Sequence, residues 1–160
     1  MLTPNDLLQF MEQNAIAGEI LFLDAPTPTV EAAAMALNTE PGQIAKSVLF
    51  ILPDRVVLAI TCGTLLIEQR ALASTFGVGR KKVKLADPET VLQMTGYPVG
   101  TVPPFGHPQS LRTIIDPRVL EHAQIYAGGG EHNAMLRLEN SQDIVRVSGA
   151  EILNLHDIPA

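Results

Sequence analysis

The sequence is poor in cysteine and in aromatic residues. Of its 160 residues, one is cysteine, none is tryptophan, two are tyrosine and five are phenylalanine. A single cysteine cannot form an internal disulfide or supply a thiolate metal cluster. The four histidines, at positions 107, 122, 132 and 156, have none of the spacings typical of zinc sites. We therefore expect no metal and no cofactor.

Long apolar runs are also missing. No stretch approaches the ~18 consecutive apolar residues of a membrane span. Asp6 and Glu12 flank the short apolar stretch near the start and no basic segment precedes it, unlike in a signal peptide. Hydrophobic residues make up 46% and charged residues 18%, which excludes a disordered chain. These features predict a single globular domain over residues 1–160, cytoplasmic and without a membrane partner.

Basic residues are outnumbered. The formal net charge of −6 argues against a protein that coats a nucleic-acid backbone by bulk charge. Four of the eleven basic residues nevertheless lie within five positions, namely Arg80, Lys81, Lys82 and Lys84. This cluster is either a solvated turn or a docking patch for an anionic partner.

Start and stop signals predict helices and strands in alternation. Helices are expected from Thr3, after Thr29, over about 66–76, over 87–96 and over 141–149, with Pro4 and Pro88 at first-turn positions. Strands are expected at 47–52, 56–61, 113–115, 125–127 and 135–138. The first two flank a short turn and are apolar on both faces, so we expect a central hairpin. The predicted fold class is α/β (α+β type) with a mixed sheet.

Several familiar site patterns are absent or weak. The segment GQIAKS, residues 42–47, lacks the glycine before the lysine of a phosphate loop and follows a helix, so we reject that interpretation. Cys62 has no basic residue or histidine beside it, which favours a structural cysteine over a nucleophile. The segment GGGEHN, residues 128–133, is typical of a wide hairpin turn.

Lys46 is a more informative residue. It is the only charged residue between Glu40 and Asp54, and strand alternation places it on the same face as Val48 and Phe50. Its ammonium group either extends into solvent at the strand end or lies in a cleft. In the second case it can hold an anionic or carbonyl group of a ligand.

A proline- and glycine-rich loop over residues 96–108 carries the second signal. It is long for a connection, and long ordered loops are often functional. Gly100 leaves the backbone bare and Pro104 stiffens it four residues later. Such a loop can offer amide donors to an oxyanion, or it can be a rigid surface loop.

Three segments in this order carry a resemblance: TPTVEAAAMALNTEPGQIAKSVLF, GYPVGTVPPFGH and IYAGGGEHNAMLRL. From about residue 22 to 153 the chain resembles the YbaK/EbsC family of aminoacyl-tRNA deacylases, which includes the editing domain inserted in bacterial prolyl-tRNA synthetases. The resemblance implies a strongly curved mixed sheet with surrounding helices. It also implies that Lys46 is the essential lysine, with Ser47 beside it. The implied substrate-binding residues are Gly100, Thr101, Val102 and Pro104 of the GxxxP motif and Gly128, Gly129 and Gly130.

Two positions depart from the family pattern. Thr101 stands where many members have a second glycine, and its side chain is expected to narrow or polarise the pocket. Asp24 stands where a histidine is common. The third segment also differs from that of the cysteine-specific members, so cysteine specificity does not carry over.

The resemblance implies hydrolysis of mischarged aminoacyl-tRNA in trans, with proline tRNA carrying a small wrong amino acid as the expected substrate. Lysine titrates near ~10.4 and is a poor general base at neutral pH, so Lys46 is expected to act electrostatically on the terminal adenosine or the ester carbonyl. Backbone amides near Gly100 or residues 128–130 would stabilise the oxyanion. A ribose hydroxyl or a group on the amino acid would activate water.

Two partners are implied, the acceptor end of the tRNA and prolyl-tRNA synthetase. The basic cluster at 80–84 is the candidate contact to the acceptor stem. The alternatives are a non-catalytic module that binds a small ligand, tRNA or a synthetase, and a hydrolase of another aminoacyl ester.

Overall fold

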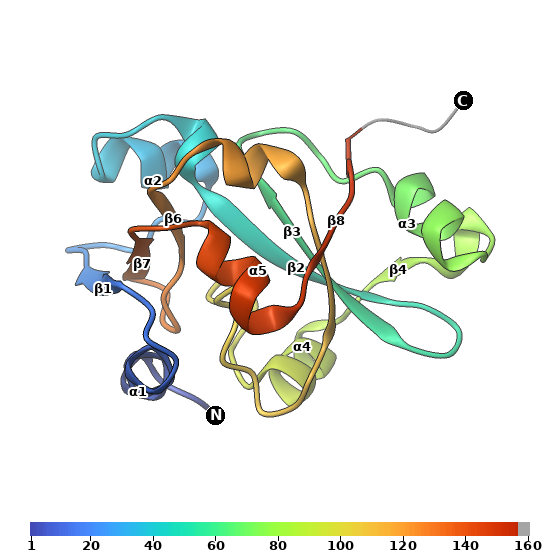
Figure 1. Ribbon diagram of the computed structural model, residues 1–160, viewed down its shortest axis with the longest axis horizontal. Coiled ribbons are helices and arrows are strands. Elements are labelled where there is room, and N and C mark those ends of the chain that lie inside the picture. The colour runs from blue at the N-terminus through green and yellow to red at the C-terminus, as the bar shows by residue number, and fades with distance from the viewer. Residues whose placement is uncertain (157–160) are drawn as a thin grey trace.

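Two β-sheets form the framework of the protein (Figure 1). The computed structural model describes residues 1–156. One sheet has the strand order β4-β2-β3-β5-β8 and the other the order β1-β7-β6. The strands are β1 Gly18–Phe22, β2 Ala45–Ile51, β3 Val56–Cys62, β4 Lys84–Leu85, β5 Arg112–Ile115, β6 Ile125–Gly128, β7 Ala134–Leu138 and β8 Glu151–Ile152. The larger sheet combines antiparallel and parallel pairs, so the predicted mixed sheet is confirmed.

Helices surround both sheets, and the start signals in the sequence are used as predicted. The helices are α1 Pro4–Gln13, α2 Val30–Ala36, α3 Gln69–Phe76, α4 Pro88–Thr95 and α5 Gln142–Ser148, with 3-10 turns η1 Pro41–Gln43, η2 Arg80–Lys82 and η3 Pro117–Glu121. Thr3 and Asp6 form a reciprocal capping box at α1. The side chains of Thr29 and Asp87 accept the amides that open α2 and α4.

The β2–β3 hairpin is central, as its apolar faces predict. β2 lies between β4 and β3, and β3 lies between β2 and β5. β2 begins two residues earlier than expected, so Lys46 pairs within the ladder, opposite Thr61. Alternate side chains enter two cores, one that contains Leu49 and one that contains Phe50. The strand that carries Lys46 is therefore fixed on both faces.

Some elements differ from the prediction. α3 begins at Gln69 and not near residue 66; the amide of Glu68, the residue before the helix, donates to the Leu155 carbonyl at 2.7 Å. β1, β4 and β8 were not predicted. β4 and β8 are two residues each, and all three strands pair with segments distant in the sequence. Local patterns carry little signal for such strands.

α2 packs on the smaller sheet and not on the hairpin. Val30, Ala33 and Ala34 contact a separate core that includes Ile44 and Met135. A parallel bridge between Ile44 and Tyr126 connects the two sheets just before β2 begins. α2 and the beginning of β2 are thereby placed beside each other.

The loop over residues 96–108 is held against β6 by a very close backbone contact. A Cβ on Gly128 would lie 2.5 Å from the Val102 carbonyl oxygen and 2.7 Å from that of Thr101. The Gly130 amide donates to the Thr101 carbonyl at 3.0 Å. The loop is buried from Thr101 to Phe105, so it is an ordered part of the interior and not a rigid surface loop.

This contact predicts that Gly128→Ala destabilises the fold. The added methyl group must displace backbone atoms, and overpacking of this kind typically costs about 1–3 kcal/mol. Urea unfolding measures the change. Gly79→Ala is the matched control, because nothing lies within 4 Å of a Cβ there, and its unfolding free energy should stay within about 0.5 kcal/mol of the parent. Equal stability of the two variants would contradict the contact.

Candidate functional site

A cavity of about 510 Å³ lies along one edge of β2. Its walls come from the segment that leads into α2, from α2 itself, from β2, from the segment around β4 and from the loop at 99–102. The lining residues are Thr27, Pro28, Thr29, Val30, Glu31, Ala33, Ile44, Ala45, Lys46, Ser47, Val48, Leu49, Thr64, Leu85, Ala86, Val91, Val99, Gly100, Val102, Gly128 and Met135. The volume is in the range of small-ligand sites.

The backbone of β2 alternates between its two edges. The Ile44 carbonyl accepts from the Gly63 amide at 3.0 Å, so the backbone groups of even-numbered residues point toward β3. The Leu49 carbonyl accepts from the Ala86 amide at 3.0 Å on the opposite edge, to which the odd-numbered residues point. Ser47 belongs to this second set.

The edge toward which Ser47 points is covered at both ends but not at Ser47. Within residues 1–156, β4 pairs only with Phe50 and Ile51, and the one bridge to β6 is at Ile44, through Tyr126, although β6 runs close to the beginning of β2. Ser47 lies between these two contacts and lines the cavity. Within residues 1–156 its amide and carbonyl have no strand partner on this edge, so they are the backbone groups of β2 that can serve a ligand in the cavity as a donor and an acceptor.

Lys46 supplies the positive charge of the cavity. Its side chain is exposed, lines the cavity, and makes no ion pair or hydrogen bond within residues 1–156. Of the lining residues only Lys46 and Glu31 ionise. The remaining walls are largely aliphatic, so these two charged groups are the ones that can orient a charged or polar ligand in the cavity.

The structure brings some of the predicted substrate-binding residues together and separates others. Lys46, Ser47, Gly100, Val102 and Gly128 all line the cavity. Pro104, Gly129 and Gly130 are buried and are not among its lining residues. Their places in the fold are structural, since Gly130 holds the loop and a Cβ on Gly129 would lie 2.7 Å from the backbone of Ala134.

Thr101 does not narrow the cavity, contrary to expectation. The residue is 1% exposed, and its hydroxyl donates to the Pro98 carbonyl at 2.8 Å. It is not among the lining residues, although Gly100 and Val102 on either side are. The hydroxyl thus stabilises the turn that precedes the buried part of the loop.

Gly100 presents bare backbone at the cavity. Its φ of +84° is in the left-handed region that favours glycine. It is exposed, and its amide has no hydrogen-bond acceptor in the part of the chain that the structure describes. A Cβ there would lie 3.9 Å from Cε1 of His132. Gly100 and Ser47 together give the cavity two available amides.

The lysine and arginine residues form two groups, those with an ion-pair partner and those without one. Five of the eleven form ion pairs, namely Arg55, Arg112, Arg118, Arg137 and Arg146. Within residues 1–156 the other six have none; one is Lys46, and the other five are Arg70, Arg80, Lys81, Lys82 and Lys84. These five, here called the basic patch, lie on α3, η2 and β4.

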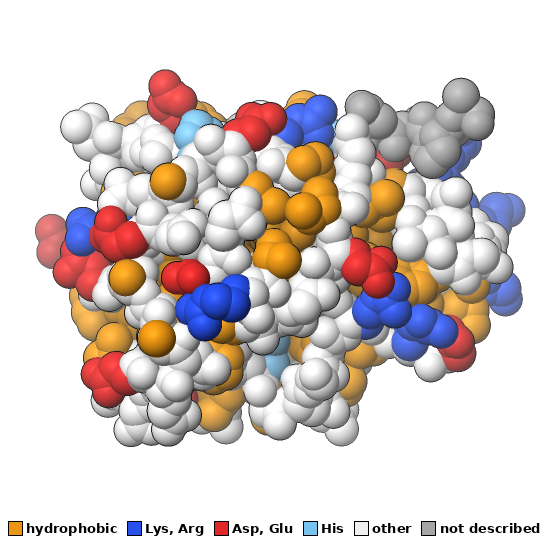
Figure 2. Space-filling view, viewed as in Figure 1, with side chains coloured by type: hydrophobic (Ala, Val, Ile, Leu, Met, Phe, Trp, Pro, Cys, Tyr) orange, Lys and Arg blue, Asp and Glu red, His pale blue; other side chains and the backbone are white. Residues whose placement is uncertain are grey.

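The basic patch is close to the cavity along the chain. Lys84 precedes Leu85 in β4, and Leu85 forms part of the cavity wall. On the face shown in Figure 2, basic side chains appear at the edge beside α3, whereas acidic side chains predominate at the opposite end, beside β1. The net acidic chain thus carries local positive charge in the segment that leads into the cavity wall at Leu85.

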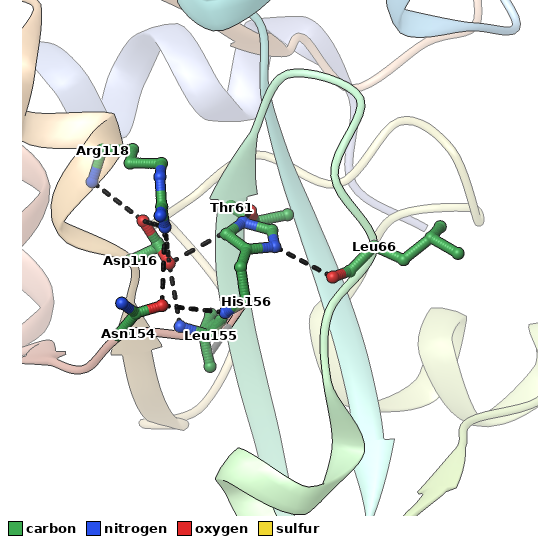
Figure 3. A network of polar contacts seen from close by, with 7 residues as sticks. All are labelled: Thr61, Leu66, Asp116, Arg118, Asn154, Leu155 and His156. Atoms are coloured by element: carbon green, nitrogen blue, oxygen red, sulfur yellow. Dashed lines mark hydrogen bonds and ion pairs between the residues drawn. The ribbon is translucent and has the colours of Figure 1, made fainter. Parts of the chain in front are cut away.

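A buried polar cluster that the sequence did not indicate lies on the other side of β3 (Figure 3). The Asp116 carboxylate is fully buried and accepts the amides of Arg118 and Leu155 at 2.9 and 2.8 Å. Nδ1 of His156 lies 2.9 Å from the Leu66 carbonyl, and Nε2 lies 2.6 Å from the Thr61 hydroxyl. Because a carbonyl only accepts, Nδ1 carries the proton.

This cluster has the residue types of a hydrolytic triad but not its geometry. Asp116 lies 3.7 Å from Nε2 of His156, the same nitrogen that contacts Thr61, so it does not orient the ring from the far side. Thr61 is 1% exposed and unavailable to a substrate. The cluster instead attaches the segment at 154–156 to the loop around Leu66, close to Thr64 of the cavity.

Cys62 is a structural cysteine, as the sequence favours. It is 5% exposed within the core. Burial, reinforced by the negative charges of Asp116 and Glu121, raises the pKa of its thiol from 9.0 to about 11. It therefore remains protonated at neutral pH and is a poor nucleophile.

The family to which the chain belongs is shown by its sequence and by its fold. A model of the aminoacyl-tRNA editing domain matches residues 24–145, and the chain belongs to this family. A solved structure described as that of a candidate trans-editing enzyme for prolyl-tRNA synthetase superposes with a TM-score of 0.88 at 26% identity, covering 98% of this chain and 99% of that one. The family resemblance and the fold class are both confirmed.

Relatives of known sequence agree. The uncharacterized protein YwhH of Bacillus subtilis is 27% identical over 121 residues, which are 75% of each chain. The proline–tRNA ligase of Thermotoga neapolitana is 31% identical over 109 residues, which are 66% of this chain but only 18% of the ligase. The similarity to the ligases is thus confined to one segment of a much longer protein.

No helix in residues 1–156 is long and apolar enough to cross a membrane. In the same part of the chain, no three side chains of His, Cys, Asp or Glu gather where they could hold a metal ion.

The raised pKa of Cys62 predicts slow alkylation. At pH 8 the thiolate fraction in the folded protein should be about 100-fold smaller than in the unfolded chain, and iodoacetamide should react correspondingly more slowly. Mass spectrometry of samples with and without guanidinium measures both rates. Equal rates in the two conditions would show that the thiol is neither buried nor shifted.

Proposed function

We propose that this protein is a trans-acting aminoacyl-tRNA deacylase that removes a small wrong amino acid from proline tRNA. The observation that carries the proposal is the convergence of Lys46, the Ser47 backbone and Gly100 on one cavity. The family relationship and the similarity to a candidate trans-editing enzyme support it. The proposed site of action is the cytoplasm, with the tRNA acceptor end and prolyl-tRNA synthetase as partners.

The reaction is hydrolysis of the aminoacyl ester. Water adds to the ester carbonyl carbon, and the negative charge develops on the carbonyl oxygen. The bond to the ribose oxygen then breaks, that oxygen takes a proton, and the products are the free amino acid and tRNA. The available amides of Ser47 and Gly100 are the candidate donors to the oxyanion.

The sequence predicted oxyanion donors near Gly100 or in residues 128–130, and the structure favours Gly100 and Ser47 instead of residues 128–130. The Gly130 amide is already bonded to the Thr101 carbonyl, so it is not free to bind an oxyanion. Lys46 lies beside Ser47, where its ammonium can hold the carbonyl oxygen or the phosphate of the terminal adenosine. No histidine lines the cavity within the described chain, so the candidates for water activation are a ribose hydroxyl, a group on the amino acid and the Glu31 carboxylate, which lines the cavity.

The cavity walls support an amino acid with an apolar side chain as the group removed, and its small size is what the relation to prolyl-tRNA synthetase editing suggests. Val30, Ala33, Ile44, Val48 and Met135 give the walls an aliphatic character. A synthetase pocket rejects a smaller amino acid by only about 1–3 kcal/mol per methylene, so a second hydrolytic site improves fidelity. The basic patch is the proposed contact to the acceptor stem, since it carries the unpaired cations nearest the cavity along the chain.

Lys46→Met tests the reaction. Removing the charge while keeping an unbranched side chain should lower kcat/KM by about 100- to 1000-fold, the range for loss of one oxyanion-stabilising group. The assay measures deacylation of proline tRNA charged with alanine, cysteine or serine. Lys81→Met removes an equal charge outside the cavity and is the matched control on a minimal aminoacyl-adenosine, which has no acceptor stem: its hydrolysis should fall in Lys46→Met and stay unchanged in Lys81→Met.

The same assay, extended to a panel of differently charged tRNAs, decides whether the protein is an enzyme or a non-catalytic binding module. Hydrolysis of one ester that is lost in Lys46→Met, with unchanged thermal unfolding, supports the deacylase. If the well-folded protein hydrolyses no member of a wide panel, the deacylase proposal is wrong and a non-catalytic binding module replaces it.

The basic patch predicts a salt-dependent contribution to tRNA binding. Changing both Lys81 and Lys82 to Gln should raise KM for aminoacyl-tRNA and reduce the slope of log KM against log salt by roughly one per lysine. Hydrolysis of a minimal aminoacyl-adenosine should not change, because that substrate has no acceptor stem. An unchanged salt slope with full-length tRNA would exclude this surface as the contact.

A further inference from the structure

Glu31 is the one anionic side chain among the residues that line the cavity. It lies in the first turn of α2, is exposed, and forms no ion pair or hydrogen bond within residues 1–156. Lys46 lines the same cavity and is equally unpaired. The two opposite charges therefore share one largely aliphatic space without neutralising each other.

A ligand that satisfies both charges must itself carry a cation and an anionic or carbonyl group. Every aminoacyl ester of tRNA fits this description, because it has an α-ammonium group beside the ester and a phosphate on the terminal nucleotide. An ammonium group enclosed by aliphatic walls without an anion would lose its hydration without compensation. Glu31 is the lining residue that can compensate it.

We propose that Glu31 binds the α-ammonium group of the aminoacyl ester and thereby restricts the substrates to esters with a free amino group. This inference rests on the proposed deacylase function and extends it. N-acylated esters, such as peptidyl-tRNA, have a neutral amide in place of the α-ammonium group. The Glu31 carboxylate then has no cation to pair with. The site thus distinguishes an amino acid newly attached to tRNA from a chain under synthesis.

Two other roles for Glu31 give different results. A carboxylate in the first turn of a helix stabilises the helix end, and Glu89 occupies the same position in α4 without lining the cavity. Glu89→Gln is therefore the matched control for helix stability. A carboxylate can also act as a general base toward water, which would affect free and N-acylated esters equally.

The experiment compares an aminoacyl-tRNA with its N-acetyl derivative as substrates of the parent, Glu31→Gln and Glu89→Gln. The parent should prefer the free amine. In Glu31→Gln, kcat/KM for the free amine should fall by about 10- to 100-fold, the range for a hydrogen bond to a charged group, while that for the N-acetyl ester changes little. Glu89→Gln should retain the parental preference.

A second measurement separates this inference from the proposed function. Binding of a non-hydrolysable 3′-aminoacylamido-adenosine, and of its N-acetyl form, is measured by calorimetry. Preferential binding of the free amine that is lost in Glu31→Gln, without any hydrolysis of esters, would support the role of Glu31 and overturn the deacylase. Hydrolysis without discrimination, an equal loss for both esters in Glu31→Gln, or no binding at all would overturn the role of Glu31.

Discussion

The architecture of the site depends on one steric constraint, the contact between Gly128 and the backbone of Thr101 and Val102. No side chain larger than hydrogen fits there without displacing carbonyl oxygens. The contact holds an irregular loop against a strand of the smaller sheet. That sheet is connected to the larger one just before β2, so Gly100 arrives beside Lys46 although 53 residues separate them in the sequence.

The proposed function requires a net acidic protein to approach a polyanion, and the distribution of its charges allows this. The ion-paired arginines are neutralised locally, and on the face shown in Figure 2 the acidic side chains gather mainly at the end beside β1, opposite the edge beside α3. The remaining cations belong to the basic patch or to the cavity. A protein that contacts only one end of a nucleic acid needs few phosphate contacts, which keeps binding weak enough for product release.

Local sequence patterns predicted the elements with strong boundaries and missed those that depend on distant partners. Asp87-Pro88 and Thr29 identified helix starts because capping is a local interaction, whereas β4 exists only through its pairing with Phe50 and Ile51. Lys46 stood out as a lone charge in an apolar strand. Glu31 did not, because a glutamate in a first helical turn is ordinary, and only the packing of α2 beside β2 gives it a second role. Thr101 was misjudged because its rotamer and its bond to Pro98 depend on the turn geometry.

Because strand pairing is missing beside Ser47, the direction of the Lys46 side chain and the direction of the Ser47 main chain both depend on the register of β2. One residue, Lys46, points its side chain out of the sheet, and the next, Ser47, points its main chain out of the sheet edge. A shift of β2 by one residue would turn the Lys46 side chain to the opposite face of the sheet and the Ser47 amide and carbonyl to the opposite edge. A one-residue insertion or deletion within β2 is therefore expected to damage the site more than most substitutions there, since the alternation of the strand is itself part of the site.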